Sequence, residues 1–131
     1  MTNTMYEDFL FWITSLVEDD PIPHEIKHLY FLISFKNNIC SLSFAGSEIF
    51  YNPLYNFEFY PLEAYFFKNE SFNNIKEIYV AKSAVKDLLE KSLENFYFAQ
   101  IFKGKSVHVC EREKQVDYTL NHWGKEELDL N

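Results

Sequence analysis

The chain has 131 residues, of which 47% are hydrophobic and 19% aromatic, with only three glycines and four prolines. This length and composition are typical of one folded domain and exclude a disordered chain or a long flexible linker, so residues 1–131 are expected to form a single globular domain. The formal net charge of −8 argues against a nucleic-acid partner, because a phosphate backbone would be repelled rather than neutralised.

The acidic residues are concentrated toward the two ends of the chain. Residues 1–25 contain six acids and no bases, and residues 106–131 contain six acids and three bases. No apolar run approaches the roughly 20 residues needed to cross a bilayer. The apolar run 9–17 has no preceding Lys or Arg, unlike a secretory signal, and Cys40 and Cys110 form no CxxC pair. We therefore expect a cytoplasmic protein that has no membrane partner.

A first helix is predicted from about Met5 to Glu18. Thr4 and Glu7 have the spacing of a capping box, in which each side chain accepts a backbone N–H that the first helical turn leaves unpaired. The apolar side chains that follow recur at the three- and four-residue spacing of one helical face. They are Phe9, Trp12, Ile13, Leu16 and Val17.

Residues 26–45 predict a β-hairpin. The first half is rich in β-branched and aromatic residues, and in the second half Cys40, Leu42 and Phe44 alternate with serines. Between them, Asn37 and Asn38 supply a residue type that tolerates the positive φ of a tight two-residue turn.

Aromatic residues occupy nine of the eighteen positions from Phe50 to Phe67. Residues 55–59 alternate between aromatic and polar, which predicts a third strand. Such a cluster can fill a core, line a pocket or form a protein-binding surface, but tyrosine hydroxyls favour contact with water or a partner. We expect the tyrosines and neighbouring acids to contact a protein partner, namely Glu48, Tyr51, Tyr55, Glu58, Tyr60, Glu63 and Tyr65.

The second half of the chain predicts mainly helix followed by a hairpin. Residues 73–82 fit either a short strand or the start of a helix, and we favour the strand. Residues 83–103 predict a long helix, residues 107–110 and 116–120 a final hairpin, and residues from about 124 a frayed acidic tail. The predicted class is α+β, with an antiparallel sheet that has both long helices packed on one face.

The string His24-Glu25-Ile26-Lys27-His28 resembles the zinc site of the HExxH metallopeptidases. This resemblance implies that His24 and His28 bind zinc and that Glu25 is the general base. The family motif lies on a helix, whereas here Pro21 and Pro23 precede it and strand-like residues follow. On a strand, four residues span about 13 Å, which is too far for two imidazoles to share a metal comfortably. We therefore keep the zinc hydrolase as an alternative only.

The remaining residues offer weaker chemical patterns. His108 and Cys110 would share one strand face, yet no neighbour completes a triad or a ligand set, and no glycine-rich phosphate loop is present. We expect no cofactor. The leading hypothesis is a non-enzymatic protein-binding module, such as an immunity or inhibitor protein that neutralises a basic toxin, for example a nuclease. The second hypothesis is a protein in which residues 50–67 and 96–102 enclose a small apolar ligand.

Overall fold

The computed structural model describes residues 2–50, 57–60, 66–112 and 114–120. Tyr51, Tyr55, Glu63, Tyr65 and the tail predicted from about 124 lie outside the described residues. The elements are, in chain order, α1 (Thr2–Asp19), β1 (His28–Lys36), β2 (Ile39–Ser47), α2 (Glu70–Asn73), α3 (Ile78–Ser92), α4 (Phe96–Ile101), β3 (Ser106–Glu111) and β4 (Val116–Leu120).

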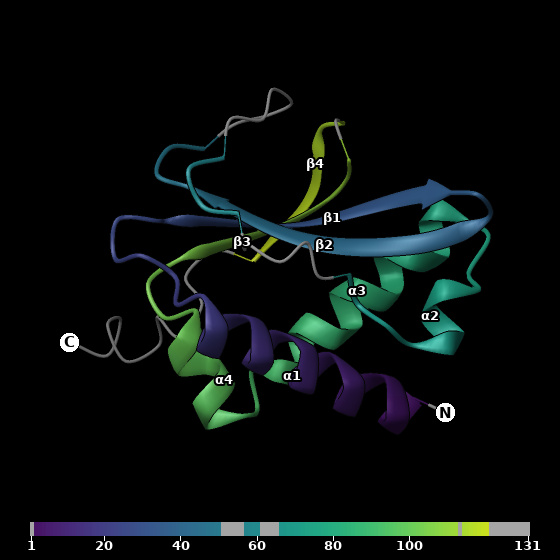
Figure 1. Cartoon of the computed structure of the whole chain (residues 1–131), viewed down its shortest axis with the longest axis horizontal. Helices are drawn as coiled ribbons and strands as arrows, with labels where there is room; N and C mark the ends of the chain where they lie inside the picture. The colour runs from purple at the N-terminus through teal and green to yellow at the C-terminus, as the bar shows by residue number, and fades with distance from the viewer. Residues whose placement is uncertain (1, 51–56, 61–65, 113, 121–131) are drawn as a thin grey trace.

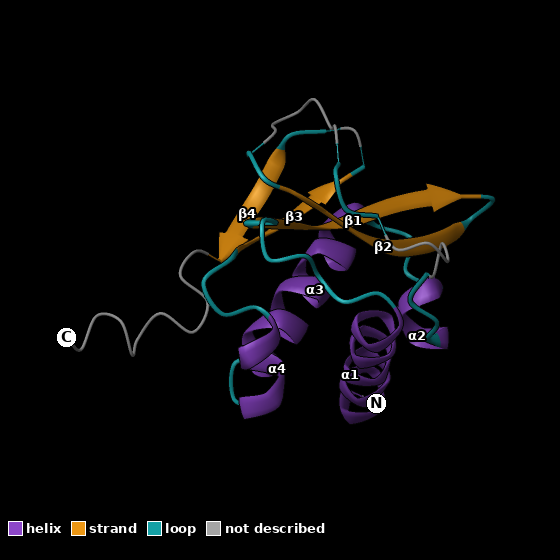
Figure 2. Ribbon diagram, turned by 60° about the vertical axis from the view of Figure 1, so that its left-hand side comes forward, coloured by secondary structure: helices purple, strands orange, loops and turns teal. Residues whose placement is uncertain are grey.

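The four strands form one mixed sheet in the order β2-β1-β3-β4. The pairs β1–β2 and β3–β4 are antiparallel hairpins, as predicted, whereas β1 and β3 pair in parallel. A parallel pair needs a crossover, and the segment that contains α2, α3 and α4 supplies it. All four helices lie on one face of the sheet (Figures 1 and 2). The α+β class and the packing of helices on one face are confirmed.

The turn between β1 and β2 forms for the reason that the sequence indicates. Asn37 and Asn38 have φ values of 54° and 64°, and Lys36 pairs with Ile39 across them. Two consecutive residues with positive φ define the two-residue turn whose twist suits a hairpin. The first helix is also confirmed, although it begins at Thr2 rather than near Met5.

The strand favoured for residues 73–82 is wrong. Residues 70–73 form the short helix α2, and α3 begins at Ile78. Ala81 lies four residues before Val85 and extends the buried stripe of α3, so the helical period governs this segment, while Tyr79 and Val80 point outward. The β-branched residues misled the prediction because they suit a strand and a helix almost equally in a short window.

The long helix predicted at 83–103 consists of two helices, α3 and α4. Asn95 separates them, because its side-chain oxygen accepts a hydrogen bond from the Phe98 N–H at 2.9 Å and so caps α4. This cap turns the chain and lets Phe98 and Phe102 enter the core with ring centroids 5.0 Å apart.

The sheet is covered on both faces, but unequally. On the helical face, alternate residues of β1, β2 and β3 pack against α1, α3 and α4 in the main core, where Phe31 lies 5.8 Å from Phe9 between ring centroids. The other face carries a smaller cluster of Tyr30, Leu32, Ala45 and Cys110, with Phe57 packed against it.

The described part of the aromatic segment divides between core and surface. Phe59 and Phe67 belong to the main core, and Phe57 packs on Tyr30 at 5.1 Å on the other face. Phe50, Tyr60 and Phe66 are exposed. Of the strand predicted at residues 55–59, the first two residues lie outside the described part, and Phe59 makes one isolated bridge to Gly46.

In the described part of the chain, no helix is both long enough and apolar enough to span a membrane.

Candidate functional site

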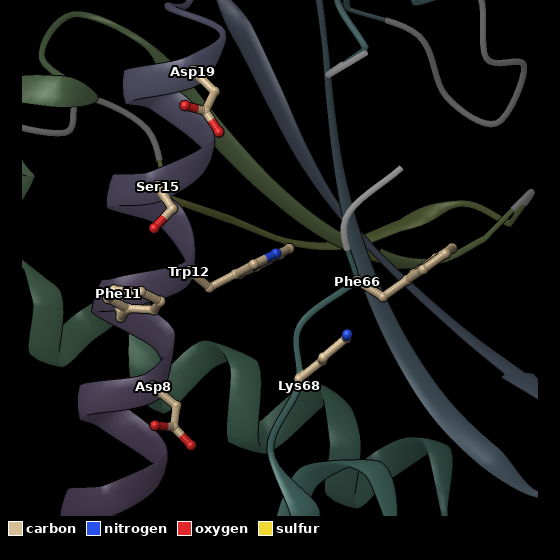
Figure 3. A pocket seen from close by; sticks show the side chains of 7 residues that line it. All are labelled: Asp8, Phe11, Trp12, Ser15, Asp19, Phe66 and Lys68. Carbon is tan, nitrogen blue, oxygen red and sulfur yellow. The ribbon is translucent and has the colours of Figure 1, made fainter. Parts of the chain in front are cut away.

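A half-open groove of about 380 Å³ lies between α1 and the segment 66–68 (Figure 3). We call it the α1 groove. Its described lining comes from one stripe of the helix and from two side chains of the facing segment. These residues are Asp8, Phe11, Trp12, Ser15, Asp19, Phe66 and Lys68.

The helical period explains why these α1 residues line one groove. Asp8, Phe11, Ser15 and Asp19 follow one another at three- or four-residue intervals, so they form a single stripe. The buried stripe that includes Phe9 faces the core instead. Apart from Trp12, which also belongs to the main core, the groove residues of α1 are therefore partly or fully exposed.

The second wall of the groove is fixed by two hydrogen bonds. The Phe67 N–H donates to the carbonyl of Leu42 in β2 at 3.0 Å, which attaches the segment to the sheet edge. The side-chain amide of Asn69 donates to Asp8 Oδ2 at 2.9 Å, which ties the segment to α1. Because Phe67 faces the core, its neighbours Phe66 and Lys68 face outward and line the groove.

Three of the seven described lining side chains are aromatic. Trp12 is 8% exposed and its ring lies 5.4 Å from that of Phe67, so it links the groove to the core. Phe11 is 75% exposed and Phe66 is 45% exposed. The Trp12 indole N–H is buried and has no hydrogen-bond partner, the one such side-chain atom within the ranges that the structure describes. An unsatisfied buried donor costs about 1–3 kcal/mol.

The two ends of the groove differ in charge. Figure 3 shows Asp8 and Lys68 toward one end and Asp19 at the other, with Trp12 and Phe66 between them. At the first end, Asp8 accepts the Asn69 hydrogen bond and lies on the same side as the Lys68 ammonium. At the second end, Asp19 follows Glu18 directly, and neither carboxylate has an ion pair with any residue that the structure describes. The groove thus has a mixed end and an acidic end.

The acidic end also coincides with the C-terminus of α1, whose last turn contains no basic residue. The carbonyl groups at a helix C-terminus carry about half a negative charge, so Glu18 and Asp19 are unfavourably placed there. Such departures from local stability rules are expected where a residue serves a function.

A second polar cluster lies on the sheet face opposite the helices. His28 Nδ1 and His108 Nε2 are 3.0 Å apart, and His108 Nδ1 lies 2.9 Å from Thr119 Oγ1. The pairing of β1 with β3 and of β3 with β4 brings the three side chains together. Next to them, the hydroxyl of Tyr30 lies 3.0 Å from that of Ser47. We call the first three residues the histidine cluster.

The histidine cluster is covered rather than open. His108 is 3% exposed, and the Phe50 ring packs over it with centroids 4.8 Å apart. Burial, together with the nearby His28, lowers the pKa of His108 to about 4, and burial lowers the pKa of His28 as well. Both imidazoles are therefore uncharged at neutral pH. His28 Nδ1 and both ring nitrogens of His108 have partners, so hydrogen bonds join the three side chains in one network.

The structure separates the residues of the HExxH string. His24 and Glu25 lie exposed in a turn, and His28 begins β1, where its nearest polar partner is His108. Uncharged imidazoles can bind a metal, but zinc sites need three or four ligands. Over the described ranges, no group of three or more His, Cys, Asp or Glu side chains could hold a metal ion.

Three residues of the predicted partner-binding set are described, and two of them, Glu48 and Glu58, are in contact. The Glu48 N–H donates to Glu58 Oε1 at 3.0 Å, and the Tyr60 hydroxyl accepts from Arg112 Nη2 at 3.3 Å. All three side chains are exposed. The other four members lie outside the described residues.

Sequence reasoning missed the α1 groove and the partner of His28. The acidic residues of α1 looked like an ordinary solvated face, and the opposite wall begins almost fifty residues later in the chain. One signal was present, because Phe11 lies beside the predicted buried stripe of α1 and is flanked by acids on the same helical face.

No protein-family model, no curated protein and no solved structure matches this chain.

Proposed function

We propose that this protein is a non-enzymatic binding protein and that it recognises a basic protein partner through the α1 groove. One observation carries the proposal, namely an exposed aromatic groove whose one end is purely acidic. Protein-binding surfaces typically combine aromatic anchors at the centre with charged groups at the rim.

The charge distribution supports a basic rather than an acidic or neutral partner. Helix α1 contains four carboxylates and no Lys or Arg, and the whole chain has a net charge of −8. Complementary charges accelerate association and select against partners of the wrong sign. An exposed ring such as Phe11 would lose unfavourable contact with water when a partner covers it.

The lining of the groove favours contact over chemistry. Its described residues include neither His nor Cys, and its single hydroxyl belongs to Ser15. An immunity or inhibitor protein that masks a basic toxin, such as a nuclease, is one role that has these requirements. The charge and the aromatic side chains of the groove support a basic protein as the partner, and a basic toxin is the more specific form of the proposal.

Two charge-reversed variants distinguish the α1 groove from the Glu48–Glu58 patch as the surface that binds the partner. Glu18→Lys/Asp19→Lys changes the acidic end of the groove, and Glu48→Lys/Glu58→Lys changes the patch predicted from the sequence by the same total charge. Proteins that the wild type captures from the producing cell are identified by mass spectrometry and purified. Biolayer interferometry at low and high salt then measures their affinity for the wild type and for each of the two variants.

We expect a basic partner whose binding is weakened by salt, lost in the α1 variant and retained in the Glu48/Glu58 variant. Loss in the second variant alone would place docking on the Glu48–Glu58 patch and overturn the role of the groove. A partner that is not basic, or one that binds both variants as tightly as the wild type, would overturn the proposed function.

A small apolar ligand is a second candidate, because a volume of about 380 Å³ falls within the range of small-molecule pockets. The enclosure predicted between residues 50–67 and 96–102 differs from this groove. In the described part of those segments, Phe98 and Phe102 pack against each other in the core, and Phe96 and Tyr97 lie exposed.

A further inference from the structure

We propose, on the basis of the function proposed above, that the α1 groove binds an extended segment of the partner with an arginine and an apolar side chain three residues apart. The arginine would lie against Asp19 at the acidic end, and the apolar side chain would lie on Trp12 between Phe11 and Phe66. The proposal thus specifies which end of the groove holds the arginine and how many residues separate the arginine from the apolar side chain.

The spacing follows from the geometry of α1. Trp12 and Asp19 are seven residues apart, which on a helix of 1.5 Å rise per residue corresponds to about 10 Å. An extended chain covers the same distance in about three residues, at about 3.3 Å each. The groove of about 380 Å³ has room for a few side chains, whereas a whole helix is about 10 Å wide with its side chains. An extended segment therefore fits better.

The position of the arginine in the groove follows from the different charges at the two ends. A cationic side chain at the acidic end meets Asp19, its neighbour Glu18 and the partial negative charge of the helix C-terminus. At the mixed end the same side chain would meet the Lys68 ammonium and a carboxylate, Asp8, that already accepts a hydrogen bond. Charge complementarity thus favours one orientation of the segment.

Arginine fits the acidic end better than lysine. A guanidinium presents five N–H donors in a planar fork and can bind one carboxylate through two parallel hydrogen bonds, whereas an ammonium acts as a point charge. Asp19 lines the groove and is exposed at the end of α1.

Synthetic peptides test this inference in the full-length protein. The peptides are blocked at both ends and share a neutral, flexible background. One has Arg and Leu three residues apart, a second has Lys in place of Arg, a third has the neutral isostere citrulline, and a fourth separates Arg and Leu by six residues. The emission of Trp12, measured in a Trp123→Phe background, reports occupancy, and calorimetry gives the affinity.

We expect the first peptide to bind most tightly, the lysine peptide less tightly, and the other two at least about tenfold more weakly. Asp19→Asn should weaken binding of the first peptide about fivefold, since this pair is partly exposed. Glu7→Gln removes the same charge from α1 outside the groove and should change the affinity less than about twofold. Equal binding of all four peptides, or equal effects of the two variants, would overturn the inference.

Failure of this inference can be told apart from failure of the proposed function. If no peptide binds while a basic partner still depends on Glu18 and Asp19, the segment is wrong and the function stands. If changes at those two residues leave the affinity of the partner unaltered, the proposed function is wrong. If an uncharged hydrophobic dye such as Nile red binds in the groove, depends on Phe66 and is not displaced by any peptide, the groove is a small-molecule site and the inference is overturned.

Discussion

The α1 groove and the histidine cluster both contain aromatic rings and ionisable side chains, but these groups are buried in the cluster and largely exposed in the groove. In the histidine cluster the polar atoms satisfy one another beneath Phe50, and burial keeps the imidazoles uncharged. In the groove the carboxylate of Asp19 is exposed, and the rings of Phe11 and Phe66 face solvent. Polar groups that satisfy one another stabilise a fold, whereas polar and aromatic groups left without partners are available to another molecule.

The largest expected difference between the two regions concerns the free energy of unfolding. His108→Ala removes a buried ring and leaves His28 Nδ1 and the Thr119 hydroxyl without their partner, so we expect a loss of about 4 kcal/mol. Asp19→Ala, at the exposed end of the groove, should change stability by less than about 0.5 kcal/mol. Urea unfolding followed by circular dichroism measures both. Similar losses in the two variants would mean that the cluster is not a structural network.

The pH dependence of stability should also distinguish the cluster from the rest of the molecule. The pKa of His108 is lowered to about 4 in the folded protein, chiefly by burial and also by His28. The unfolded chain therefore binds the proton more readily, since an unperturbed histidine has a pKa of about 6.5. The stabilising contribution is present above pH 6.5 and is lost as the pH falls from about 6.5 toward about 4, by about 3 kcal/mol in total.

The comparison that isolates this effect uses two single variants. His108→Asn removes the titrating ring, so its unfolding free energy should fall less steeply between pH 6.5 and 4 than that of the wild type. His24→Ala, in an exposed turn, should keep the wild-type slope. Parallel curves for wild type and His108→Asn would show that other groups dominate acid unfolding.

The local parts of the fold were predictable from the sequence, and the long-range parts were not. The Asn37–Asn38 turn and the apolar stripe of α1 depend on neighbouring residues, so the pattern alone indicates them. The contact of His28 with His108 joins residues eighty positions apart and depends on the parallel pairing of β1 with β3. The α1 groove was unpredictable for the same reason, because its second wall is set by the hydrogen bond from Phe67 to Leu42.

A smaller effect is expected from the hydroxyl at the end of the histidine cluster. Thr119→Val keeps the shape of the side chain but removes the hydrogen bond to His108 Nδ1, so we expect a loss of about 1–1.5 kcal/mol. Ser15→Ala removes a hydroxyl from the groove lining and should be nearly neutral. Differential scanning calorimetry of the two variants shows whether the hydroxyl contributes to stability in the cluster and makes no such contribution in the groove. A neutral Thr119→Val would remove that residue from the network.

A smaller change in stability, of opposite sign to the losses in the histidine cluster, is expected at the acidic end of α1. Replacing Asp19 with Lys puts a positive charge at the helix C-terminus, which should raise the free energy of unfolding by about 0.5–1 kcal/mol. Glu7→Lys makes the same charge change away from that end and corrects for the general relief of a net charge of −8. Thermal unfolding measures the difference between the two variants.

The same Asp19→Lys protein should lose affinity for the basic partner while it gains stability. This trade-off is expected when a locally unfavourable charge is kept for binding. A variant that is more stable and still binds as tightly as the wild type would mean that the acidic end of the groove is a surface feature without a role in recognition. A variant that is less stable than Glu7→Lys would mean that Asp19 makes a stabilising contact that outweighs its unfavourable interaction with the helix dipole.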